Sequence, residues 1–122
     1  MSTRSTIAMK TNGENYLQIY CHWDGYIEGG VGEMLINHYN TYEEVEDLIM
    51  MGDASSINET LEESEFYHRD RNEDLQVEYY KDLTSFKSER MNEEYDYLFQ
   101  DEEWYIIKDD FNLVKVKDVV LK

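Results

Sequence analysis

Two alternating segments joined by an Asn-Gly pair constrain the fold of this chain more than any other feature. Residues 5–11 and 16–23 alternate between apolar and other side chains, which predicts two strands. Asn12 and Gly13 both tolerate a positive φ angle, so the link between the strands predicts a tight hairpin. The alternation divides the second strand into a core face, Leu17, Ile19, Cys21 and Trp23, and a polar and aromatic face, Tyr16, Gln18, Tyr20 and His22.

Two amphipathic helices are predicted directly after this hairpin. A glycine-rich turn leads into apolar residues that recur with helical spacing from Val31 to Tyr39. Thr41 and Glu44 then form the pattern of a capping box, in which each side chain bonds to the backbone N–H of the other. Gly52 is expected to end the second helix in a left-handed conformation.

The rest of the chain is expected to extend the same sheet. Residues 53–65 predict a loop, 75–80 a third strand and 83–91 a short helix. Residues 95–100 and 103–108 predict a second hairpin, and residues 113–120 an edge strand. We expect a single α+β domain over residues 1–122, with an antiparallel sheet of about five strands and two or three helices packed on one face.

The charge of the chain limits its partners. It has 28 acidic and 11 basic side chains, a net charge of −17, and residues 43–122 hold most of the excess acid. Such a surface repels nucleic acid and attracts basic proteins over roughly 8–10 Å at physiological salt. The excess of acidic side chains either keeps the protein soluble or mimics the charge pattern of nucleic acid. The expected acidic partner face consists of Glu43, Glu44, Glu46, Asp47, Glu62, Glu63, Glu93, Glu94, Glu102 and Glu103.

Catalytic and metal-binding chemistry find little support in the sequence. Cys21 and His22 are neighbours on a predicted strand, so their side chains point to opposite faces and cannot form a nucleophile–base pair. The single cysteine cannot make an internal disulfide, which suits the reducing cytosol. No cysteine or histidine has the spacing of a metal site, and no apolar run reaches the roughly 20 residues of a membrane span. We therefore expect no enzymatic activity, metal, cofactor or membrane anchor.

The segment from Tyr20 to Tyr26 is the densest group of versatile side chains, and it allows two interpretations. In the structural one, Trp23 anchors the core and Asp24 caps the turn. In the functional one, His22, Trp23, Asp24 and Tyr26 belong to a binding site, in which Trp23 or Tyr26 stacks on a nucleotide base and Asp24 accepts its N–H groups. The phosphate would then be bound by the only local concentration of positive charge, His68, Arg69 and Arg71. Charge compensation by local acids is the simpler explanation of that cluster.

Several segments together resemble a family of small, largely uncharacterised proteins of bacteriophages and prophages. They are Ser2–Ala8, Tyr20–Tyr26, Gly52–Ile57, Tyr67–Arg71 and Tyr95–Trp104, in the order of the family. The sequence departs from the family at Ile27, where a proline is common. The resemblance implies a phage origin and action in the cytoplasm of the infected bacterial host, and it implies no mechanism.

Two functional hypotheses follow. The first is an inhibitor that uses its acidic face against the basic, nucleic-acid-binding surface of a host protein, as in anti-CRISPR or anti-restriction counter-defence. The second is a binder that sequesters a nucleotide signal at the corner formed by Trp23 and Tyr26. Charge favours the first hypothesis, since an acidic field hinders the approach of an anionic ligand. A homo-oligomer that assembles through the aromatic hairpin is left open.

Overall fold

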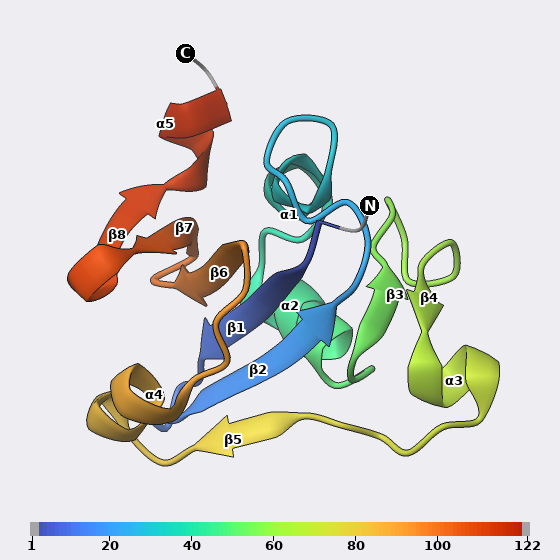
Figure 1. The fold of residues 1–122 in the computed structure, drawn as a ribbon, viewed down its shortest axis with the longest axis horizontal. Coiled ribbons are helices and arrows are strands. Elements are labelled where there is room, and N and C mark those ends of the chain that lie inside the picture. The colour runs from blue at the N-terminus through green and yellow to red at the C-terminus, as the bar shows by residue number, and fades with distance from the viewer. Residues whose placement is uncertain (1–2, 121–122) are drawn as a thin grey trace.

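A computed structural model describes residues 3–120 of the chain (Figure 1). The strands are β1 Ser5–Lys10, β2 Tyr16–Cys21, β3 Ala54–Ser56, β4 Glu65–Phe66, β5 Glu78–Tyr80, β6 Tyr95–Gln100, β7 Glu103–Lys108 and β8 Asn112–Lys115. The helices are α1 Val31–His38, α2 Tyr42–Ile49, α3 Tyr67–Arg71, α4 Leu83–Glu89 and α5 Val116–Val120, with a short 3-10 turn at Asp109–Phe111. The predicted α+β class is confirmed. None of the helices in this part of the chain is long and apolar enough to cross a bilayer.

The sheet is mixed, and the prediction of a wholly antiparallel sheet of about five strands was wrong. Its eight strands follow the order β4-β3-β2-β1-β6-β7-β8, and β5 pairs with β2. The hairpins β1–β2 and β6–β7 are antiparallel as predicted, but β1 pairs with β6, and β2 with β3, in parallel. Parallel partners are far apart in sequence, so no turn motif announces them. The extra strands β3 and β4 are only two or three residues long, too short for a pattern, and the strand predicted over residues 75–80 is present as the shorter β5.

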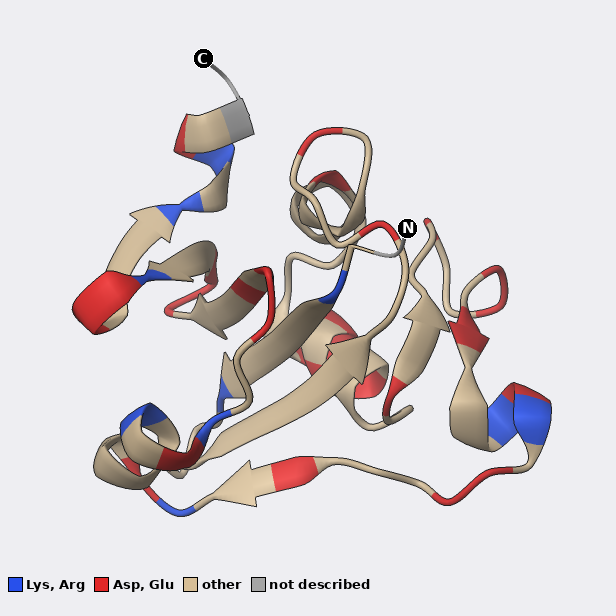
Figure 2. Cartoon of the chain, viewed as in Figure 1, with Lys and Arg blue, Asp and Glu red and all other residues tan. Residues whose placement is uncertain are grey.

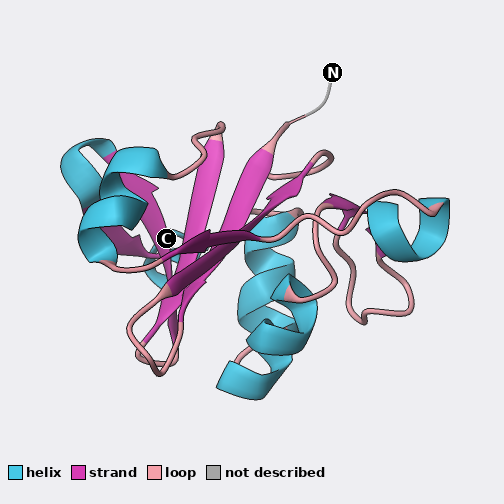
Figure 3. Cartoon of the chain, turned by 90° about the horizontal axis from the view of Figure 1, so that it is seen from below, coloured by secondary structure: helices cyan, strands magenta, loops and turns pink. Residues whose placement is uncertain are grey.

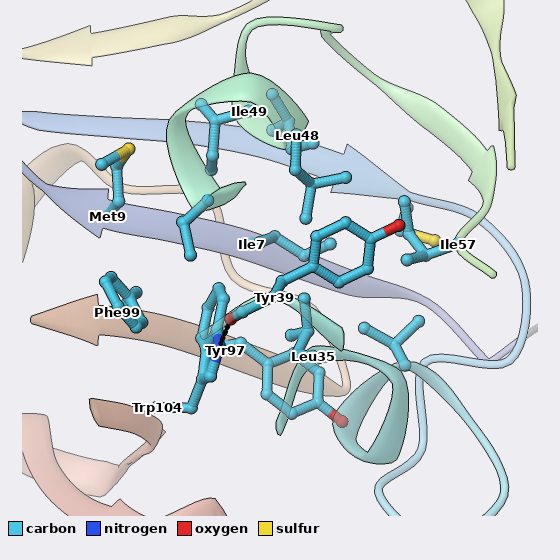
Figure 4. Close-up of a cluster of buried hydrophobic side chains, with 14 of the residues drawn as sticks. Ile7, Met9, Leu35, Tyr39, Leu48, Ile49, Ile57, Tyr97, Phe99 and Trp104 are labelled. Carbon is cyan, nitrogen blue, oxygen red and sulfur yellow. Dashed lines mark hydrogen bonds between the residues drawn. The ribbon is translucent and has the colours of Figure 1, made fainter. Parts of the chain in front are cut away.

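Both faces of the sheet are covered, which corrects the expectation of helices on one face only. In Figure 1, α2 lies behind β1 and β2 while α4 lies in front of them, and Figure 3 shows the same arrangement from below. The larger core lies on the α1 and α2 side and includes Ile7, Leu35 and Trp104, whose indole donates to the Tyr39 carbonyl at 2.7 Å (Figure 4). On the other side, Phe86 of α4 packs with Ala8, Tyr16, Tyr80, Leu98 and Ile107.

The end of β2 differs from its predicted alternation. Trp23 was expected in the core, but 44% of its surface is exposed. His22 and Trp23 both donate their backbone N–H groups to β3, at the carbonyls of Ala54 and Ser55. Successive residues of a regular strand point these groups to opposite sides. The alternation therefore ends at Cys21, and Trp23 is not directed into the core.

Other local predictions are confirmed in part. Thr41 and Glu44 make both bonds of the capping box, and Gly52 has a φ of 83° after α2. The segment 53–65, predicted as a loop, contains β3 and the first residue of β4. The last predicted strand ends at Lys115, where α5 begins. The last two residues of the chain and the first two lie outside the described residues.

Candidate functional site

The corner after β2 holds four of the sequence-predicted site residues, His22, Trp23, Asp24 and Tyr26. The Tyr20 hydroxyl lies 2.7 Å from Nδ1 of His22. The rings of His22 and Trp23 pack edge to face, with their centres 4.8 Å apart. Tyr26 donates its hydroxyl to Oδ1 of Asp24 at 3.1 Å, which raises the pKa of the Tyr26 phenol. The corner thus exposes the rings of Trp23 and Tyr26, and the Tyr26 hydroxyl is already bonded within it.

The backbone of this corner is fixed from three sides. The Gly25 N–H donates to the Thr3 carbonyl at 2.8 Å, and the Gly25 carbonyl accepts the Tyr97 hydroxyl at 2.6 Å. Asp24 has a φ of 57°, and its carbonyl accepts the N–H of Val31 at the start of α1. The sequence motif from Tyr20 to Tyr26 therefore supports the structure directly, because it joins the sheet to α1.

Arg69 and Arg71, on α3, are both held by acids. Arg69 makes two hydrogen bonds to Asp70, with Nη2 at 2.8 Å from Oδ2, and the pair lowers the pKa of Asp70. Arg71 pairs with Glu65 at 2.9 Å and stacks on Tyr67. These contacts fit charge compensation better than phosphate binding.

The structure brings only one of the two arginines toward the corner. Arg71 Nη2 lies 3.4 Å from the Ser55 hydroxyl, and the Ser55 carbonyl accepts the Trp23 N–H. Arg69 reaches the other way, to the carbonyls of Leu61 and Ser64, and His68 contacts the Glu73 carbonyl through Nδ1 at 2.7 Å. The three cations therefore do not gather at the aromatic corner, and only Arg71 reaches toward it.

The predicted acids of α2 belong to a larger group that we call the α2 acidic surface. Glu44 and Asp47 line a groove of about 230 Å³ together with Glu59. Glu43 lines a cleft of about 850 Å³ together with Asp101 and Glu102 at the β6–β7 turn. The α2 acidic surface consists of Glu43, Glu44, Glu46, Asp47, Glu59, Asp101 and Glu102. Glu59 and Asp101 were missed by the sequence interpretation, which had no means of placing their loops beside α2.

Two other predicted acids lie at the opposite end of the sheet. Glu93 and Glu94 precede β6 and line a separate cleft of about 580 Å³ with Asp109 and Asp110. Glu102 follows β6, so the length of the strand separates it from Glu94, about 20 Å at 3.3 Å per residue. The ten predicted acids therefore do not form one continuous face.

The remaining predicted acids are engaged locally. Glu103 lies 3.2 Å from Lys117 and 4.0 Å from Lys115, so its charge is compensated. Glu63 accepts the Thr60 hydroxyl at 3.0 Å in the turn before β4, next to Glu62. The Glu63 bond stabilises this turn, and Glu62 beside it is exposed.

Most of the acidic charge has no basic partner nearby. Within residues 3–120, which include all 28 acids, only Glu14, Glu65, Asp70, Asp96 and Glu103 lie within 4 Å of a basic group. Asp96 is the only acid that is buried. Figure 2 shows the acids on α2 and on the connecting loops, whereas the ribbons of β1 and β2 are largely uncharged. The exposed surface therefore has a strong negative field.

Cys21 is buried, and its thiol is weakly acidic. Burial raises the pKa of the Cys21 thiol to about 12, so the thiolate needed for nucleophilic attack is scarce at neutral pH. No group of three or more histidine, cysteine or acidic side chains in the described part of the chain could hold a metal ion.

Comparisons with protein-family models, with curated proteins and with solved structures gave no match to this chain. Its function is therefore inferred from the charges and contacts of the described residues. The likeness to phage and prophage proteins stays an expectation from the sequence.

Proposed function

We propose that the chain is a non-enzymatic, phage-encoded binding protein that acts in the cytoplasm of the infected bacterium. Its α2 acidic surface occupies the basic, nucleic-acid-binding surface of a host defence protein, such as a CRISPR or restriction effector. The target is thereby kept from its nucleic acid, and the phage is protected.

One observation carries this proposal: 23 of the 28 acids have no basic group within 4 Å among the described residues. Uncompensated charge of one sign is costly to the folded chain through self-repulsion, and it attracts a partner of the opposite sign. Six of the seven acids of the α2 acidic surface line two hollows, and Glu46 lies on the same helix. Such a surface offers several carboxylates at once to a groove rich in lysine and arginine.

The nucleotide-binding alternative has less support. It requires an arginine that is free to bind phosphate beside the aromatic rings, but Arg69 and Arg71 are paired with acids. None of the three hollows described above is lined by Trp23 or Tyr26. We therefore retain the inhibitor alone.

The experiment compares two variants of equal charge in defended cells. Glu43→Gln, Asp47→Asn and Glu59→Gln together remove three charges from the α2 acidic surface. The control, Glu93→Gln, Glu94→Gln and Asp109→Asn, removes three charges at the opposite end of the sheet. Each protein is expressed in bacteria that carry a defined CRISPR or restriction system, and the plating efficiency of a sensitive phage is measured.

We expect the wild type and the control to restore plating by similar factors, and the α2 variant to restore it much less. Equal activity of the two variants would show that total charge, and not the α2 acidic surface, matters. Failure of the wild type to restore plating against every system tested would contradict the counter-defence function.

A further inference from the structure

The open edge of β5 is the feature that neither the site nor the proposed function has used. Among the described residues, β5 pairs with β2 alone. In Figure 1 it runs along the outside of β2, and no element lies on its other side. Residues 78–80 form this edge, and residues 75–77 lead into it.

The backbone groups that face outward can be assigned from the hydrogen-bond pattern. The N–H of Tyr20 points away from β1, to Oδ1 of Asp53 at 2.9 Å. Even-numbered residues of β2 therefore point their backbone groups toward β5, where their partners are Glu78 and Tyr80. Tyr79 lies between these partners, so its N–H and carbonyl face outward, where an added strand would bond to them.

The side chains along this edge offer an apolar contact. Tyr79 is 60% exposed and Leu75 is 46% exposed, whereas Val77 packs against the core between them. Leu75 is held in place against Gly52, where an added Cβ would lie 2.7 Å from its Cδ1. Tyr79 on β5 and Leu75 in the segment before it therefore both expose apolar surface along this edge, and an added strand can contact it with its side chains.

Charge selects the kind of strand that the edge would accept. Four acids, Glu73, Asp74, Glu78 and Asp82, lie along or beside it with a single basic residue, Lys81. A second copy of this edge would bring like charges together, which disfavours self-pairing.

We propose that the edge of β5 binds an extended, lysine- or arginine-rich segment of the target protein as an added antiparallel or parallel strand. Backbone bonds to Tyr79 supply the affinity, and the surrounding acids select the basic sequence. This inference rests on the proposed function, because it names a second contact through which the same basic partner is held.

The test uses two variants that differ only in one backbone donor. Tyr79→Pro removes the outward N–H of β5, and Tyr79→Ala removes the same side chain but keeps that N–H. The probe is a fluorescent peptide of alternating lysine and valine, about eight residues long so that it spans the edge. A second peptide of the same composition has every other residue in the D configuration, which keeps the charge but prevents a regular strand. Circular dichroism and thermal unfolding are used to check that both variants are folded before binding is compared.

We expect Tyr79→Pro to bind the all-L peptide at least about tenfold more weakly than Tyr79→Ala. The reason is that proline removes one backbone hydrogen bond and interrupts the row of bonds between β5 and the added strand. Hydrogen exchange of the Tyr79 amide should slow when the all-L peptide binds the wild type. Equal binding by the two variants, or equal binding of the two peptides, would overturn the edge site and leave the proposed function standing. A dimer that Tyr79→Pro abolishes would assign the edge to a second copy and also overturn it. If neither peptide binds at low salt, the electrostatic basis of the proposed function itself fails.

Discussion

Asp96 is a buried acid that joins β1, β6 and the segment after α4 through its carboxylate. Its Oδ1 accepts the Thr6 hydroxyl at 2.7 Å and the Glu93 N–H at 3.0 Å, and its Oδ2 lies 3.3 Å from Nη1 of Arg90. The side chains of Arg90 and Asp96 are only 12% and 8% exposed. Asp96→Ala therefore leaves a guanidinium with little solvent and no counter-ion, together with two unsatisfied donors.

We expect Asp96→Ala to lower the free energy of unfolding by about 3–5 kcal/mol, the usual cost of removing one partner of a buried pair. This is a large part of the 5–15 kcal/mol or so that holds a domain together. Urea unfolding, followed by tryptophan fluorescence and circular dichroism, measures this change in the free energy of unfolding. It is seen as a lower urea concentration at the midpoint, with the dependence of the free energy on urea concentration unchanged.

A second variant distinguishes the stranded charge from a general loss of packing. Asp96→Asn with Arg90→Met keeps an acceptor for the Thr6 hydroxyl and removes both charges, so most of the stability should return. A loss below about 1 kcal/mol in Asp96→Ala, or no recovery in the double variant, would refute the assigned role of this pair.

The remaining predictions concern other buried positions. Cys21, whose pKa is raised to about 12 by burial, should react with a thiol reagent only at the rate of unfolding; rapid stoichiometric labelling of the native protein would contradict this. Asp53→Ala should cost about 1–3 kcal/mol because the Tyr20 N–H loses its acceptor, while Asp53→Asn should cost less. Burial raises the pKa of Asp53, so folding disfavours the ionised form of its carboxyl. The wild type should therefore gain stability relative to Asp53→Asn as the pH falls through that raised pKa. Urea titrations at several pH values measure this difference, and an opposite slope would count against it. Gly52→Ala should cost about 1–2 kcal/mol, since φ is 83° and the new Cβ meets Leu75, and a neutral thermal midpoint would show that the turn can relax.

Local motifs in the sequence predicted the elements whose stabilising contacts are close in the chain. The β1–β2 and β6–β7 hairpins, the capping box of Thr41 and Glu44, and the left-handed Gly52 all depend on neighbours within a few residues. Their physical causes are turn geometry and backbone capping, which a short window of sequence contains. The structure confirms these elements, but the first hairpin turns at Glu14, with a φ of 62°, and neither Asn12 nor Gly13 has a positive φ.

The second face of the sheet could not be predicted in the same way. Thr6 and Gln18 alternate with core residues and resemble a solvated face, but both are fully buried. Asp96 accepts the Thr6 hydroxyl, and Gln18 bonds to the backbone of Met91, more than 70 residues away in the chain. Alternation distinguishes the two faces of a strand, but it does not show whether a distant segment covers the second one.

The candidate site was predicted in its composition and not in its arrangement. The acids of α2 were identified from charge, but their neighbours Glu59 and Asp101 are brought to them by loops whose course depends on tertiary packing. Trp23 and Arg71 were identified as versatile residues, and the structure places both beside β3. Their hydrogen bonds, which decide whether they are free to bind a ligand, depend on partners that are distant in sequence.

The displacement of DNA from a defence effector tests the central claim most directly. Labelled duplex is bound to the purified effector whose defence the chain blocks, and wild-type protein is titrated in at about 50 mM and about 300 mM salt. The account predicts stoichiometric displacement at low salt, a steep loss of inhibition at high salt, and a weaker effect of the α2 variant than of its charge-matched control. DNA that stays bound at both salt concentrations, or displacement that does not depend on salt, would contradict it.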